Sequence, residues 1–195
     1  TVIEQVYFID QGVASVVAQT AGQRDIEIGV IGPEGMTGQA LLHADRQSPF
    51  ETFMQVEGYG YRLPAGRLAE AMQQSDNLRL TLLRYSRAFN LQVASTSVAN
   101  GSSKLEERLA RWLLMVGDRV GGSFSITHAF LATMLAVRRP GVTLALQILE
   151  GRGLIRSSRG SVLIIDREGL IQATNGSYGM AEREQNRLFN TRSPE

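Results

Sequence analysis

The side chains best suited to chemistry in this sequence are arginines in its C-terminal third. Between Thr127 and Arg167 there are six arginines against two acidic residues, Glu150 and Asp166, which gives this stretch a net charge of +4. Residues 1–100 carry seven arginines against ten acidic residues, a net charge of −3. A basic segment beside an acidic one is typical of a chain that binds a polyanion through one half. An arginine-rich solvated surface is the alternative, and charge alone leaves both open.

The residue types give little support to a catalytic or metal site. The chain has no cysteine, which excludes disulfides, thiolate catalysis and cysteine-ligated iron–sulfur clusters, and it has only two histidines, His43 and His128. A lone histidine is more often a surface residue than a haem ligand. Glu106 and Glu107 are adjacent, so on a helix they diverge by about 100° and do not form a catalytic carboxylate pair. With no Ser–His–Asp set and no Walker-type glycine loop, we expect no enzymatic activity.

Two short helices are expected to position the first pair of arginines. Thr127 is a good N-cap for an amphipathic helix, and Ala136-Val137 predicts a tight turn after it. A second helix begins at Arg138 or Arg139, with Pro140 in its first turn, where proline is tolerated. Its buried stripe is expected to contain Val142, Leu146 and Leu149, and it ends at Gly151 or Gly153. Two helices joined by a compact turn, the second starting with two arginines, indicate a helix-turn-helix.

Residues 153–166 read as a strand, a tight turn at Arg159-Gly160 and a second strand. Such a hairpin beside a helix-turn-helix is a wing. Its tip carries Arg159 and neighbouring serines, which are side chains suited to phosphate contact. The segment therefore predicts a winged helix-turn-helix.

The first 63 residues read as short β-strands separated by glycine turns. Strands are predicted over 6–9, 13–17, 26–31, 51–56 and 58–63, with turns at 10–12, 21–23 and 32–35. This spacing is typical of a small barrel or sandwich. No apolar run approaches the roughly 20 residues needed to cross a bilayer, so we expect a cytoplasmic protein with no membrane contact.

After Pro64 the apolar period becomes helical, with a short helix over 67–74, a long one from Leu78 to about Val98 and another over 104–118. The long helix has two apolar stripes and needs two surfaces to pack against. We assign one to the β-domain and the other to a partner helix in a dimer, while burial within one larger domain is the alternative. The residues expected at the dimer interface are Leu82, Tyr85, Ser86, Phe89 and Val93. The polar residues from Thr174 onward predict a partly disordered tail.

The C-terminal motifs resemble the DNA-binding domain of the cyclic-AMP receptor protein superfamily, which includes the fumarate-and-nitrate-reduction regulators. They are Leu-Ala-Val-Arg-Arg-Pro-Gly-Val-Thr from Leu135, Leu-Glu-Gly-Arg-Gly-Leu-Ile from Leu149, and the wing's Arg-Gly. The upstream run Leu-Glu-Glu-Arg-Leu-Ala-Arg-Trp from Leu105 is similar to the helix that opens that domain. Residues 7–17 and 31–38 resemble the latter part of the family's β-roll, with the earliest strands apparently missing.

The resemblance implies a homodimer that binds double-stranded DNA, with RNA polymerase as a further partner to consider. It places Arg139 where the recognition helix reaches base edges, and an arginine there can bind guanine with two hydrogen bonds. It places Arg138, Thr127 and His128 near phosphates. Thr143 and Gln147 lie further along the exposed face, and Arg159 lies at the wing tip. The sequence departs from well-known members at Pro140 and Leu144, where those carry polar base-reading residues, so their operator sequence is not carried over.

The N-terminal half, which resembles the family's sensor domain, lacks the pattern expected for binding cyclic AMP. Family members that bind this ligand combine a Gly-Glu-Leu-type turn with a nearby arginine that pairs with the phosphate. Here the turn reads Gly32-Pro-Glu-Gly-Met, and residues 47–54 lack an arginine, with Arg46 just before them. The sequence therefore identifies no cofactor, and the binding of cyclic AMP is not expected. The effector is another small molecule, a protein or none.

The predicted fold class is α+β, with an N-terminal cyclic-nucleotide-binding-like β-roll, a long dimerisation helix and a C-terminal winged helix-turn-helix. The expected boundaries are 1–76 for the sensor domain, 77–100 for the long helix, 101–173 for the DNA-binding domain and 174–195 for the polar tail. The predicted function is that of a sequence-specific, homodimeric transcription regulator. The alternative is an effector-binding protein-interaction module whose winged helix does not read DNA, which Pro140 and Leu144 keep open.

Overall fold

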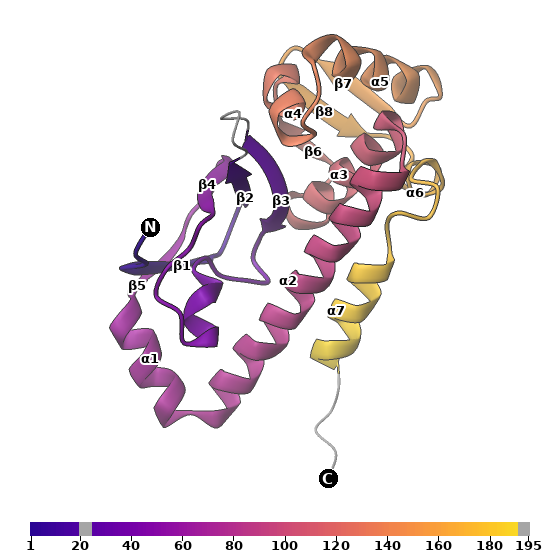
Figure 1. Cartoon of the computed structure of the whole chain (residues 1–195). Helices are drawn as coiled ribbons and strands as arrows, with labels where there is room; N and C mark the ends of the chain where they lie inside the picture. Colours follow the sequence, from indigo (N-terminus) through magenta and orange to yellow (C-terminus); the bar gives the residue numbers. More distant parts are fainter. Residues whose placement is uncertain (20–24, 191–195) are drawn as a thin grey trace.

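Antiparallel strands form the N-terminal half of the structure, a computed structural model that describes residues 1–19 and 25–190 (Figure 1). β1 (Gln5–Ile9) pairs with β5 (Gly60–Pro64). β2 (Val13–Gln19) lies between β3 (Asp25–Ile31) and β4 (Glu51–Val56). The strand predictions are confirmed to within a few residues at their ends. The turn predicted at 21–23 lies outside the described residues, and a 3-10 helix, η1 (Gln39–His43), was not predicted.

A short helix, α1 (Ala65–Gln74), leads into the long helix α2 (Asp76–Ser102). The Ser75 side chain caps α2 by accepting a hydrogen bond from the Leu78 amide at 3.2 Å. The helix extends two residues beyond the expected end, through Gly101. Figure 1 shows α2 crossing the molecule from the β-domain to the C-terminal domain, so one rigid element joins the two halves.

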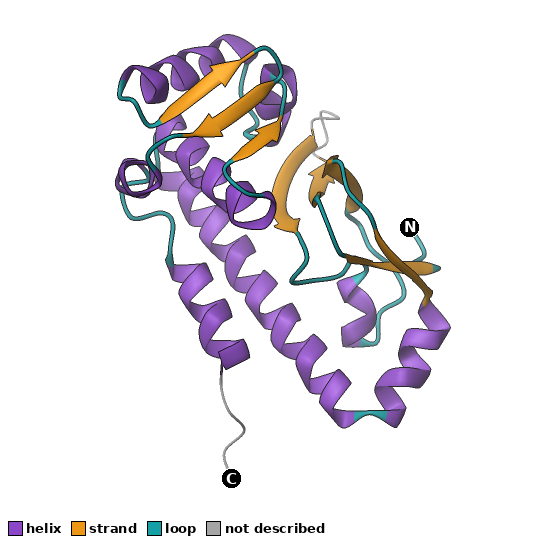
Figure 2. Ribbon diagram, turned by 180° about the vertical axis from the view of Figure 1, so that it is seen from behind, coloured by secondary structure: helices purple, strands orange, loops and turns teal. Residues whose placement is uncertain are grey.

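The C-terminal domain is a winged helix-turn-helix, as predicted. It consists of α3 (Leu105–Val120), β6 (Ser123–Ser125), α4 (His128–Met134), α5 (Arg139–Gly151), β7 (Ile155–Ser158), β8 (Ser161–Ile164) and α6 (Arg167–Ala173). The strands form one antiparallel sheet in the order β6-β8-β7, seen from behind in Figure 2. The predicted architecture of β-domain, long helix and winged helix-turn-helix is therefore confirmed.

The apolar residues of α4 and α5 belong to the core of this domain. Leu131, Val142, Leu146 and Leu149 are fully buried there, together with Leu109 and Leu113 of α3. Among the described residues, no single helix is long and apolar enough to span a membrane. α4 and α5 are long and apolar enough only when they are taken together, and a bend of 105° separates them.

The segment after Thr174, predicted as a partly disordered tail, is partly helical in the residues that the structure describes. Thr174 is fully buried, and residues Met180–Asn190 form a helix, α7, that lies beside α2 in both overall views (Figures 1 and 2). Ala181 is buried on its inner face. The sequence signal was present but weak, because only Ala181, Leu188 and neighbouring aliphatic stems make the apolar side of a polar helix.

Candidate nucleic-acid interface

The helix-turn-helix is held by bonds from both of its helices and from α3. The Thr127 side chain caps α4 by accepting a hydrogen bond from the Phe130 amide at 3.1 Å. In the turn, Ala136 has a φ of 54°, and the Val137 amide donates to the Ala132 carbonyl at 2.9 Å. The Arg108 guanidinium of α3 donates to the carbonyl of Leu135. These contacts fix the direction in which α5 leaves the turn.

α5 presents one face to the core and the opposite face to solvent. Val142, Ala145, Leu146 and Leu149 are buried, which includes the stripe predicted from the sequence. Arg138 is the N-cap residue, and Arg139 and Pro140 form the first turn. The solvent face contains Arg138, Arg139, Pro140, Leu144, Gln147 and Ile148.

Five of the seven predicted DNA contacts lie on the surface: Thr127, Arg138, Arg139, Gln147 and Arg159. Within the part of the chain that the structure describes, the guanidiniums of Arg138, Arg139 and Arg159 form no ion pair. Unpaired guanidiniums retain their hydrogen-bond donors for phosphate or guanine. The N-terminal end of α5 adds a partial positive charge at the same place.

His128 and Thr143, the other two predicted DNA contacts, are in contact with each other. The His128 Nδ1 lies 3.1 Å from the Thr143 hydroxyl, and that hydroxyl lies 3.2 Å from the Arg139 carbonyl oxygen, to which it donates. Both side chains are half-buried between α4 and α5. These contacts hold the first turn of α5 against α4, and the DNA contacts expected of His128 and Thr143 stay a prediction.

The wing is fastened to the end of α5. The Glu150 carboxylate accepts a hydrogen bond from the Ser157 amide at 2.9 Å. Gly160 has a φ of 78°, a left-handed conformation that favours glycine at the hairpin turn. Arg159 and Ser158 are exposed beside it, so the wing tip carries a cation on the same domain as α5.

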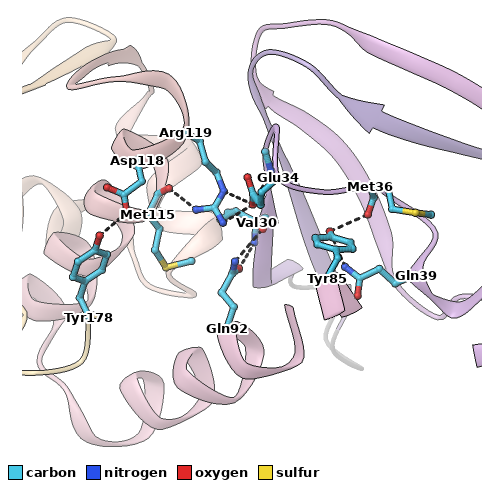
Figure 3. A network of polar contacts seen from close by, with 11 residues as sticks. Val30, Glu34, Met36, Gln39, Tyr85, Gln92, Met115, Asp118, Arg119 and Tyr178 are labelled. Atoms are coloured by element: carbon cyan, nitrogen blue, oxygen red, sulfur yellow. Dashed lines mark hydrogen bonds and ion pairs between the residues drawn. The ribbon is translucent and has the colours of Figure 1, made fainter. Parts of the chain in front are cut away.

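The residues predicted at the dimer interface face the chain's own β-domain instead. Leu82, Tyr85, Ser86 and Phe89 are buried there, and Val93 packs against the same cluster. The Tyr85 hydroxyl donates to the Met36 carbonyl at 3.0 Å (Figure 3), and the Ser86 hydroxyl lies 2.7 Å from His43 Nε2. Gly35 leaves room for the Tyr85 ring, since a Cβ there would lie 2.2 Å from it. In the single chain these five residues therefore pack within their own β-domain, and their place at a dimer interface stays a prediction.

The other apolar stripe of α2 is the exposed one. Leu80 is 48% exposed and Val98 is 67% exposed, and Ala94 is also on the surface. With the half-buried Leu91, these residues are spaced 11, 3 and 4 apart in the order Leu80, Leu91, Ala94 and Val98. The residues of a coiled-coil seam are separated by steps of 3 and 4, and 11 is a sum of such steps. The sequence showed both stripes, but only the position of the β-domain decides which one remains free.

A polar interface joins the β-domain to α2 and α3. The Gln92 side chain of α2 accepts from the Val30 amide and donates to the Val30 carbonyl at the free edge of β3 (Figure 3). Arg119 of α3 forms an ion pair with Glu34 at 2.6 Å, with side chains only 10% and 21% exposed. Phe53 of β4 packs edge-on against Phe130 of α4 at 5.9 Å. Sequence reasoning missed these contacts because each joins residues far apart in the chain.

Glu27 is the most perturbed acid at this interface. Its carboxylate accepts hydrogen bonds from the Trp112 indole at 2.7 Å and from the Ser15 hydroxyl at 2.6 Å. Burial raises its pKa from the ordinary 4.5 to about 7, although both hydrogen bonds and the nearby Arg111 and Arg119 lower it. An acidic residue within the apolar strand 26–31 was the signal that sequence analysis could have used.

A cavity of about 300 Å³ lies between the β-domain and α2. Of its lining residues that the structure describes, only His43 and Asp45 are titratable, and Ile28, Phe50 and Phe89 provide apolar walls. The described lining thus includes the carboxylate of Asp45 and no arginine. Nor do the described residues include a cluster of three or more potential metal ligands.

The comparisons with known proteins agree with this geometry. Residues 107–173 match the family of Crp-like helix-turn-helix domains. The whole-chain fold is similar to that of a CRP-family transcriptional regulator from Thermus thermophilus (TM-score 0.72, 19% identity, 90% of each chain). It is also similar to FixK2 from Bradyrhizobium japonicum (TM-score 0.76, 16% identity, 89% of this chain and 88% of that chain). At these identities the likeness shows the fold. No curated protein sequence matches the chain.

Proposed function

We propose that this chain, which carries a Crp-like helix-turn-helix domain on the fold of the CRP/FNR regulators, is a homodimeric transcription regulator that binds specific DNA sequences. The observation that carries the proposal is the pair Arg138 and Arg139, which are exposed and unpaired at the start of α5. Guanidiniums at the N-terminal end of a surface helix are suited both to phosphates and to guanine.

The exposed residues fall into two groups, those that contact bases and those that contact phosphates. Arg139, in the first turn of α5, binds the O6 and N7 atoms of a guanine, and Gln147, two turns further, is suited to an adenine. Arg138, Arg159 and the Thr127 hydroxyl contact phosphates on either side of the groove. The phosphate contacts set affinity and its salt dependence, whereas Arg139 and Gln147 set sequence preference.

The second copy of the chain docks on the exposed stripe of α2. Leu80, Leu91, Ala94 and Val98 are apolar, and Ala94 is small enough for the two helices to approach closely. Two α5 helices related by a two-fold axis then read a two-fold symmetric site with half-sites about 10 base pairs apart.

A small effector binds in the 300 Å³ cavity, whose wall includes η1 and α2. Its apolar walls and the polar groups of His43 and Ser86 suit an uncharged or weakly polar molecule. Because α2 also carries the dimer stripe, such a ligand is positioned to change the pairing of the two copies.

A second candidate function is supported by Leu144 and Ile148, which are apolar and exposed on α5. An exposed apolar helix face is also what a protein-docking surface contains. In that case the chain is an effector-binding interaction module, and its affinity for DNA is weak and independent of sequence.

The test is selection from a randomised DNA duplex pool, followed by affinity measurements at several salt concentrations. The proposal predicts enrichment of a two-fold symmetric motif and an affinity that falls steeply with salt. The Arg138→Ala/Arg139→Ala double variant should lose that enrichment, whereas Arg67→Ala, which removes one arginine of α1, should keep it. Salt-dependent binding without any enriched motif would favour the second candidate.

A further inference from the structure

The solvent face of α5 is unusually apolar for a helix that has exposed arginines at both ends. Leu144 is 58% exposed and Ile148 is 39% exposed. With Pro140 they form one row of residues four apart, so they lie above one another on the same side of the helix. None of the three is needed by the core, whose stripe of Val142, Leu146 and Leu149 lies on the opposite face.

The polar residue nearest this row is Gln147, which neighbours Leu144 at three residues' separation and is also exposed. Arg138 and Arg139 precede the row at the start of α5, Arg152 follows it at the C-cap, and all three are exposed. An apolar row with cations at both ends of its helix fits a ligand that is anionic at its edges and apolar at its centre. The major groove of DNA has that character wherever a thymine presents its C5 methyl group between two phosphate backbones.

We propose that Leu144 reads a thymine through its C5 methyl group, with Ile148 extending the same contact. This inference rests on the proposed function and names the chemistry of its sequence preference. In the major groove the methyl group is present on thymine and absent from the three other bases, so an apolar side chain pressed against it discriminates without a hydrogen bond. Gln147 beside it accommodates an adenine through N6 and N7, which favours A·T pairs under this part of the helix.

The position of this contact relative to Arg139 follows from helix geometry. Leu144 lies five residues beyond Arg139, which is about 7.5 Å along the α5 axis and about 140° around it, so the two side chains leave the helix in different directions. Each half-site should therefore contain a G·C pair read by Arg139 and, at a separate position, a thymine read by Leu144.

The experiment replaces each thymine of the selected operator by uracil, one symmetric pair of positions at a time, and measures the dissociation constant of the full chain. Uracil keeps the base pair and all hydrogen-bonding groups and lacks only the methyl group. Losing one buried methyl per half-site should weaken binding about fourfold, or about 15-fold for the symmetric pair. The effect should occur at one thymine position per half-site, separate from the guanine that Arg139 reads.

The same measurement on Leu144→Ala completes a double-mutant cycle. Uracil substitution at that position should have no effect on Leu144→Ala, because the methyl group has already lost its partner. Leu144 is exposed, so its replacement leaves the core intact. Arg139→Ala should remain sensitive to uracil, and Met180→Ala, which trims an exposed apolar side chain of α7, should behave as the unmodified chain does.

The outcomes separate this inference from the proposed function. If a symmetric motif is enriched but uracil substitution changes nothing, or changes binding equally with Leu144→Ala, then Leu144 does not read thymine although the chain is a specific DNA binder. If no duplex is enriched, the proposed function itself fails, and the apolar row of α5 is a protein-docking face.

Discussion

At the scale of single residues, the proposed function makes Arg139 the main reader of guanine. Arg139→Ala should abolish the preference for guanine at the position that Arg139 reads, a loss of about 1–3 kcal/mol, while salt-dependent binding to any duplex persists. The measurement is competition binding with operators altered at that base pair. The variant should remain folded and dimeric, since the Arg139 side chain has no intramolecular ion pair among the described residues. Retention of the full preference would contradict the assignment.

Glu27 makes stability depend on pH. Because burial raises its folded-state pKa from 4.5 to about 7, the folded protein binds a proton more tightly than the unfolded chain does. This contribution is fully present below about pH 4.5 and is lost as the pH rises through about 7, amounting to at most about 3 kcal/mol.

Glu27→Gln should remove this contribution. The glutamine cannot ionise, and it can still accept the hydrogen bond from the Trp112 indole. We expect urea denaturation at pH 5, 6, 7 and 8 to show a smaller fall in the free energy of unfolding for the variant than for the unmodified chain. An identical fall in both would mean that other groups cause the pH dependence.

The residues of the candidate interface were predictable to the extent that local pattern defines them. Thr127 as a cap, Pro140 in a first turn and the buried row Val142, Leu146 and Leu149 all follow from residue type and spacing. The pairing of His128 with Thr143 was not predictable, because it depends on how closely α4 and α5 pack.

At the scale of elements, α2 carries the proposed pairing of two chains. Leu91→Asp or Val98→Asp should convert the dimer to a monomer by burying a carboxylate in the seam, and should thereby lose tight binding to the symmetric site. Light scattering measures the mass, and circular dichroism should show an unchanged helix content. A matched variant on the surface of α2 outside the cavity, Ser97→Asp, should remain dimeric.

Phe89→Asp has a different expected outcome. Phe89 is 8% exposed and packs against Gly29, where a Cβ would come within 2.9 Å of its ring. A charge there should destabilise the β-domain by several kcal/mol. Thermal denaturation should show this loss, whereas an unchanged melting temperature together with a monomeric mass would restore the interface predicted from the sequence.

The elements themselves were largely readable from apolar periodicity, but their partners were not. The two stripes of α2 are equivalent in the sequence, and the tertiary position of β3 and η1 decides which is covered. α7 was taken as a tail because polar residues dominate it, yet it is folded against α2. The periodicity of apolar residues shows which face of a helix is apolar. The surface that covers this face depends on contacts between segments that are distant in the sequence.

At the scale of the whole molecule, the ion pair between Glu34 and Arg119 connects the β-domain turn to α3. A double-mutant cycle with Glu34→Gln and Arg119→Met should give a coupling free energy of about 1–3 kcal/mol, larger than for a fully exposed pair because both side chains are mostly buried. The readout is the free energy of unfolding from urea titrations. The exposed pair Arg67 and Glu70 is the control, with an expected coupling below about 1 kcal/mol.

The length of α2 has a mechanical consequence for the molecule. Its 27 residues make a rod of about 40 Å, with the proposed effector cavity and η1 against its middle and the winged domain beyond its C-terminal end. The arm from Phe89 to that end is about 20 Å, so a tilt of about 10° at the cavity displaces the end by about 3.5 Å, which is one base-pair rise. In the proposed symmetric dimer the two α5 helices then move relative to each other, and their spacing no longer matches one turn of the DNA duplex. A small tilt of α2, which leaves the fold of each domain unchanged, thus switches the dimer between a form that binds the operator and one that does not.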